Sequence, residues 1–137
     1  MNPAFIFFLI CMLAVCGFAI LKGGNDERLG AVALAAAAIL SPVALASDWN
    51  RPEAGIILVD VALLVALLLL ALRSVAFWPL WATGFQLCAV AVHVVALVSP
   101  SLLPAAYAET LALWAYPVLA SLAIGTWLEA EAHHGQR

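Results

Sequence analysis

Three ionisable side chains stand inside long apolar stretches of the sequence, and these are the residues most able to do chemistry. Asp60, His93 and Glu109 each lie in a different stretch. If each stretch is a spanning helix, a rise of about 1.5 Å per residue puts them roughly 10, 9 and 7 Å below one membrane boundary. An unpaired ionisable group at that depth is costly. We therefore expect Asp60 and His93 to be in contact, with Glu109 within reach.

Small and polar residues extend this cluster along two of the stretches at three- and four-residue spacing. One such face consists of Ala82, Gln86, Ala89, His93 and Ala96. The other consists of Glu109, Ala112, Tyr116, Ala120 and Ala123. Such faces are typical of helix contacts in lipid. We predict that both point into a helix bundle, which adds Gln86 and Tyr116 to the intramembrane polar cluster.

The polar cluster has three interpretations. An Asp–His contact is often only a hydrogen bond that joins two helices. Ionisable groups inside spans also carry protons or ions in transporters. The third interpretation is a pocket for haem, pigment or quinone, with His93 as the candidate cofactor ligand. The ligand types of Asp60, His93 and Glu109 suit a transition metal, but their spacing specifies no metal site.

Catalytic motifs are missing from the sequence. It contains no G-x-S-x-G, H-E-x-x-H, P-loop or G-x-G-x-x-G pattern. We interpret the adjacent His133 and His134 as a solvated pair. Cys11, Cys16 and Cys88 fall in apolar stretches, where cysteine acts as a small packing residue. We expect a protein that is not an enzyme, and the sequence specifies no cofactor.

The composition indicates that most of the chain lies within a lipid membrane. Of the 137 residues, 67% are apolar and 9% are charged, whereas a soluble domain is about half apolar and a quarter charged. The net charge is −3 and there is no basic patch, which excludes nucleic acid as a partner. The apolar runs are continuous rather than alternating, which argues against a β-barrel.

Five apolar stretches have about the 20 residues that a spanning helix needs. They cover about residues 3–21, 27–46, 52–72, 78–98 and 104–128, and a short polar tail, 129–137, follows them. Backbone in lipid must be helical to satisfy its polar groups. The expected fold is an all-α polytopic membrane helix bundle with five transmembrane helices. Four helices are the alternative, because 27–46 is rich in alanine and contains Ser41 and Pro42.

The basic residues favour five spans. Five spans place Lys22, Arg28, Arg73 and Arg137 on one side and Arg51 on the other, whereas four spans divide them three to two. The positive-inside rule then puts the N-terminus outside and the C-terminus in the cytoplasm.

Tryptophan and alanine add two further expectations. Trp78, Trp81 and Trp127 fall near the cytoplasmic boundary, where tryptophan is enriched, and Trp114 lies deeper and should pack against neighbouring helices. Alanine lets backbones approach closely, so stretch 27–46 should pack centrally or against a partner.

Several short segments carry a family resemblance. They are KGG at 22–24, ERL at 27–29, FWPLW at 77–81 and WAYP at 114–117. With these segments the chain resembles the small, uncharacterised multi-span proteins of the bacterial inner membrane. The resemblance implies that membrane as the location, but no activity and no site residue.

These observations favour a non-catalytic integral membrane protein that is an accessory or assembly subunit of a membrane complex or homo-oligomer. Its partners would be the lipid bilayer and other membrane subunits or further copies of itself. The alternative is a small transporter or a proton- or ion-conducting protein that uses Asp60, His93 and Glu109. A further alternative is haem, pigment or quinone binding within the bundle.

Overall fold

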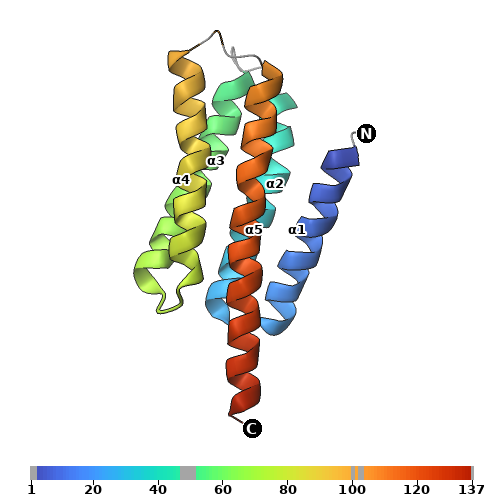
Figure 1. The fold of residues 1–137 in the computed structure, drawn as a ribbon, viewed down its shortest axis with the longest axis vertical. Coiled ribbons are helices and arrows are strands. Elements are labelled where there is room, and N and C mark those ends of the chain that lie inside the picture. Colours follow the sequence, from blue (N-terminus) through green and yellow to red (C-terminus); the bar gives the residue numbers. More distant parts are fainter. Residues whose placement is uncertain (1–2, 47–51, 100, 102–103, 137) are drawn as a thin grey trace.

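A computed structural model describes residues 3–46, 52–99, 101 and 104–136, without the side chains of 44–46, 52–53 and 104–109. These residues form five helices, shown in Figure 1: α1 (Pro3–Lys22), α2 (Asn25–Ala46), α3 (Pro52–Arg73), α4 (Trp78–Val98) and α5 (Pro104–Gly135). The expected all-helical bundle is confirmed, and the five stretches match the helices closely. The polar segment after residue 128 differs, because it continues α5 and extends beyond the other helices.

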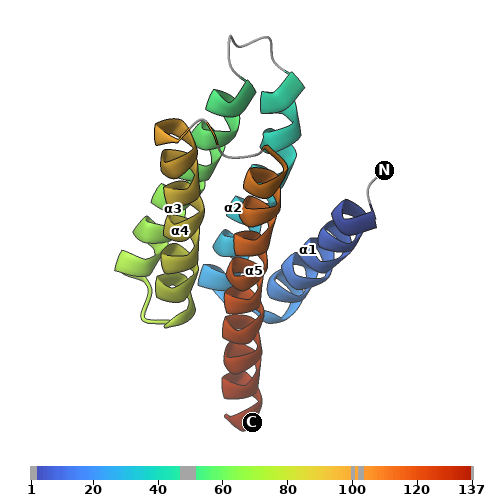
Figure 2. The same ribbon diagram turned by 45° about the horizontal axis from the view of Figure 1, so that its top comes forward.

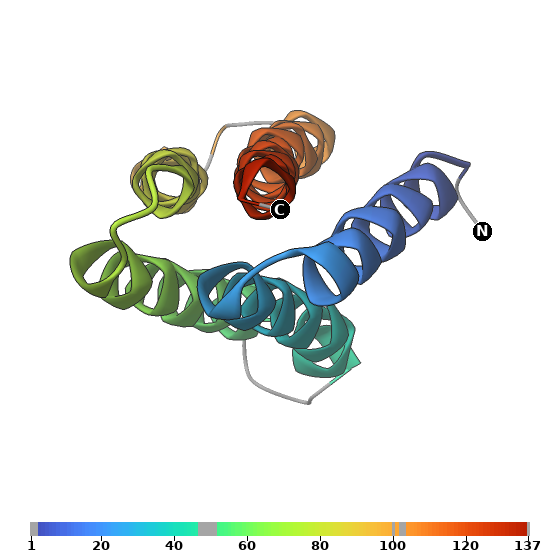
Figure 3. The same cartoon turned by 90° about the horizontal axis from the view of Figure 1, so that it is seen from below.

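The helices run up and down in chain order and close on themselves. Each helix contacts the next, α5 returns to contact α1, and α2 also touches α5. Seen from below, α1, α2 and α3 form one row that α4 and α5 cover (Figure 3). The alanine-rich α2 is therefore packed centrally, as its composition predicts. The N-terminal end of α1 leans away from the other helices (Figures 1 and 2).

The exterior of the bundle is far more apolar than that of a soluble protein. Large apolar side chains such as Phe7, Leu13 and Leu113 are more than half exposed, whereas Gln86 and His93 are buried. Among the described residues, four helices, α1, α3, α4 and α5, are long and apolar enough to cross a membrane. The described part of α2 begins with a run of charged residues, Asp26, Glu27 and Arg28. A lipid environment accounts for this exterior.

The face of α4 agrees with the prediction, but that of α5 does not. Ala82, Gln86, Ala89 and His93 are all buried, as expected. On α5, however, Ala112 and Ala120 are exposed. The buried apolar residues of α5 are Val118, Leu119 and Leu122. The predicted face was wrong because Gly125 lies against the ring of Trp78, and this contact turns Val118, Leu119 and Leu122 inward.

Trp78 fixes the rotation of α5 about its axis. Its ring is only 4% exposed and lies between two glycines on different helices. A Cβ on Gly30 of α2 would stand 2.3 Å from the ring, and a Cβ on Gly125 of α5 would stand 2.2 Å from it. Trp78 is buried, while Trp81 and Trp127 are exposed. The expected depth of all three near the cytoplasmic boundary stays a prediction.

Trp114 packs against a neighbouring helix, as predicted. Trp114 stacks on Phe85 of α4 with ring centroids 6.4 Å apart. Offset aromatic pairs at this separation stabilise a helix contact. The α4–α5 interface is therefore joined at two levels, by Trp114 near its middle and by Trp78 near its end.

We predict that Gly125→Ala destabilises the bundle, because the new methyl group must displace the Trp78 ring. The free energy of unfolding in detergent should fall by about 1–3 kcal/mol, the usual cost of overpacking. Gly84→Ala is the matched control, since nothing lies within 4 Å of its Cβ position. Unfolding followed by circular dichroism measures both variants, and equal stability of the two would contradict the packing described for Trp78.

Candidate functional site

Asp60, Gln86 and His93 form one hydrogen-bonded group, hereafter the Asp60 cluster. His93 Nε2 lies 2.6 Å from Asp60 Oδ2. Gln86 Nε2 donates to Asp60 Oδ1 at 3.1 Å and to the Asp60 carbonyl oxygen at 3.2 Å. The predicted contact between Asp60 and His93 is therefore present, and Gln86 is part of the same group.

Local helix geometry explains why the cluster forms. Gln86 and His93 are seven residues apart on α4, which is about two turns, so both side chains leave the same face. Asp60 lies opposite them on the antiparallel helix α3. His93 is 1% exposed and the Asp60 side chain 23% exposed. A hydrogen bond from imidazole to a carboxylate is charge-assisted and strong in surroundings of low polarity.

The two other predicted members have different outcomes. Tyr116 packs against α1, with ring centroids 6.2 Å from Phe7 and 5.8 Å from Phe8. No hydrogen bond joins it to the Asp60 cluster within the described part of the chain. The side chain of Glu109 lies outside the described residues. Tyr116 is separated because the buried face of α5 is rotated from the predicted one.

Asp60 also lines a pocket of about 300 Å³ that is partly open to the outside of the bundle. Side chains of α1, α2 and α5 line it, together with Asp60 and Gln86. Pro42 lies in its wall, at a point where proline removes a helical hydrogen bond. The exposed part of Asp60 is thus turned toward this pocket, where its carboxylate can bind water, a proton or a small polar group.

A second polar group, which the sequence interpretation missed, lies nearer the C-terminal end. We call Gly24, Glu27 and Trp78 the Glu27 cluster. Trp78 Nε1 donates to Glu27 Oε1 at 2.8 Å, and the backbone N–H of Gly24 donates to Oε2 at 2.9 Å. The second bond is half of a capping box at the start of α2. Beside it, the hydroxyl of Ser74 donates to the carboxylate of Asp26.

An apolar layer separates the two clusters. Gln86 and Trp78 are eight residues apart on α4, or about 12 Å along the helix. Ala82, Leu67 and Leu122 occupy the interval and are fully buried. Among the described residues, no hydrogen bond joins the two clusters. The described residues also contain no group of three potential metal ligands.

We predict that Asp60→Asn keeps more stability than His93→Leu. An amide can still accept from Gln86 and bond to the imidazole, whereas leucine leaves Asp60 Oδ2 without this donor. The free energy of unfolding should fall by about 1–3 kcal/mol for His93→Leu and by clearly less for Asp60→Asn. Val94→Leu, at an exposed position of α4, controls for the new side chain. Equal losses in detergent titration would contradict a hydrogen-bonding role.

Comparison with known proteins gives no relative. No family model matches the chain, and no curated protein and no solved structure matches it. The role of the chain must therefore be argued from its own geometry.

Proposed function

We propose that the chain is a multi-pass protein of the bacterial inner membrane with five spans. The supporting argument is connectivity. α1 and α3 are both apolar enough to cross, and α2 lies antiparallel between them (Figure 1). If α1 and α3 cross in the same direction, α2 must return the chain through the bilayer. Its three leading charges then lie at the membrane surface.

The same arrangement supports an N-terminus outside and a C-terminus in the cytoplasm. Lys22 ends α1, Arg28 lies in the first turn of α2 and Arg73 ends α3, so these cations gather at the end that carries the C-terminus. Basic residues near span ends favour the cytoplasmic side.

Reporter fusions test this topology. Alkaline phosphatase fused after Ala46 should be active, because it would be exported, and a fluorescent protein fused after Arg137 should fluoresce in the cytoplasm. Cytoplasmic signals from both positions would remove α2 as a span and contradict the proposal.

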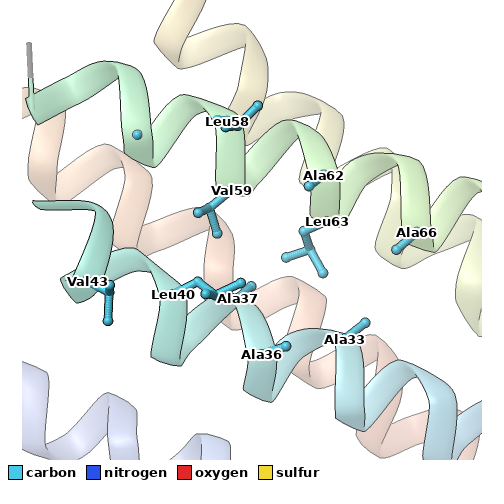
Figure 4. A pocket seen from close by; sticks show the side chains of 11 residues that line it. Ala33, Ala36, Ala37, Leu40, Val43, Leu58, Val59, Ala62, Leu63 and Ala66 are labelled. Carbon is cyan, nitrogen blue, oxygen red and sulfur yellow. The ribbon is translucent and has the colours of Figure 1, made fainter. Parts of the chain in front are cut away.

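Within this membrane we propose a non-catalytic accessory or assembly subunit that receives a transmembrane helix of another subunit or of a second copy. The observation that carries this proposal is an open groove of about 490 Å³ between α2 and α3 (Figure 4). Its small lining residues are Ala33, Ala36, Ala37, Gly55, Ala62 and Ala66. The remaining lining residues are leucine and valine.

The shape of this groove suits a helix. Its lining recurs at three- and four-residue spacing over 33–43 and 55–66, so it runs for about 15 Å along both helices. Ala36, Ala62 and Ala66 are exposed, and the part of the chain that the structure describes leaves the groove open. Small residues let a helix backbone approach closely and gain packing contacts that lipid chains do not match.

We predict that Ala36→Leu with Ala62→Leu disrupts an assembly without unfolding the bundle, because both positions are exposed. In a mild detergent extract, the wild-type chain should migrate on a native gel as an assembly larger than one chain. The double variant should migrate as a single chain. Ala91→Leu, an exposed position on α4, should migrate like the wild type. Migration of the wild type as a single chain would contradict the proposal.

The cavity beside Asp60 favours a second candidate, proton- or ion-coupled transport. Asp60 is the one carboxylate among the described residues that line this cavity. The apolar layer below it argues for the accessory role instead, since proton conduction needs a connected polar route. If the wild-type chain carries protons into vesicles and Asp60→Asn abolishes this flux, the result favours transport.

A further inference from the structure

A groove between α4 and α5 combines a buried carboxylate with aromatic walls. It encloses about 510 Å³, and its lining includes Trp78, Trp81 and Phe85 as well as Glu27 and Glu129. Trp81 is 53% exposed, so the groove opens to the surface of the bundle. It shares no lining residue with the groove between α2 and α3.

Glu27 has no cation to balance its charge among the described residues. The residue is 3% exposed, and within the described part of the chain its two oxygens accept only from the neutral N–H groups of Trp78 and Gly24. The ion pairs of the described chain involve other carboxylates, those of Asp60 and Glu129. Arg28, the next residue, instead donates from Nε to the carbonyl of Ile20 on α1. A buried carboxylate with neutral partners alone favours a cation beside it.

A second carboxylate converges on the same place. The position that a Cβ on Gly24 would take lies 3.1 Å from Glu27 Oε2 and 3.3 Å from Glu129 Oε1. Glu129 is partly exposed and lies 3.1 Å from the imidazole of the exposed His133. The two carboxylates thus create a local negative potential at the end of the groove.

The aromatic residues supply the rest of the site. Phe77, Trp81 and Phe85, which line the groove, form a series of ring contacts with centroids 5.7 and 6.1 Å apart. Ring faces attract cations and also bury apolar groups. Such walls suit a molecule that carries a positive charge on an apolar body.

We propose that this groove binds a hydrophobic organic cation. The charged group lies beside Glu27 and Glu129, and the apolar body lies on Trp81 and Phe85. Because the groove opens on an apolar face of α4 and α5, the ligand enters from the lipid side. The site is independent of the assembly proposed for α2 and α3.

Tetraphenylphosphonium is a suitable probe, and tetraphenylborate is its control of the same shape and opposite charge. The full chain in nanodiscs of zwitterionic lipid should bind the phosphonium saturably in equilibrium dialysis, beyond the uptake by empty nanodiscs. It should not bind the borate saturably. Equal binding of both ions would mean that the groove is an apolar surface without selectivity for a cation, which would overturn the proposal. The absence of saturable phosphonium binding would overturn it as well.

Variants locate the binding. Glu27→Gln keeps an acceptor for Trp78 but removes the charge, and the Kd should rise about tenfold. Trp81→Leu should also raise it. Glu131→Gln and Trp127→Leu, at exposed positions outside the groove, should leave it unchanged. If Glu27→Gln does not fold, Glu129→Gln and Trp81→Leu serve as the test, and both should raise the Kd. Unchanged binding in the folded groove variants would overturn the proposal.

Discussion

The hydrogen bond from Trp78 to Glu27 is the contact on which the bundle depends most. An indole N–H and a carboxylate that are both buried must each find a partner, and here each satisfies the other across 2.8 Å. The bond joins the start of α2 to the start of α4. Because Gly30 and Gly125 admit the ring from both sides, it also fixes the position of α5. The buried face of α5 and the groove between α4 and α5 both follow from this one contact.

The Asp60 cluster holds the other half of the bundle by the same means. Lipid provides little driving force to bring apolar helices together, so polar contacts and close packing must do it. Asp60 joins α3 to α4 through two side chains, while Leu67 and Leu122 fill the layer beneath. Two polar layers with an apolar layer between them fix the alignment of the helices and leave their exteriors for lipid, a helix or a ligand.

The sequence predicts what depends on hydropathy and on neighbouring helices. Continuous apolar stretches locate the helices, and the shared depth of Asp60 and His93 predicts their contact across the adjacent pair α3 and α4. The Glu27 cluster depends instead on two residues 51 positions apart. Nothing in the local pattern around Trp78 distinguishes a buried tryptophan from one at the membrane boundary.

The helical phase of α5 shows the same limit. The regular spacing of Ala112, Tyr116 and Ala120 predicts a buried face, but Gly125 must meet Trp78, and that contact turns larger side chains inward. A face of small residues can equally contact a helix outside the chain. The groove between α2 and α3 has small residues of this kind on its open side. The spacing of small residues in one sequence does not tell whether they contact a helix of the same chain or a helix of a partner.

Cross-linking in native membranes tests the central claim, that this groove receives a transmembrane helix. Ala62→Cys, in a chain whose three native cysteines are replaced by alanine, would be labelled with a short membrane-permeant maleimide that carries a diazirine and then irradiated, so that any residue of a neighbouring helix can be captured. We predict a cross-linked product larger than the chain, which Ala91→Cys at an exposed position of α4 does not form. If neither variant forms such a product while both react with a permeant monofunctional maleimide, the groove faces lipid and the claim is wrong.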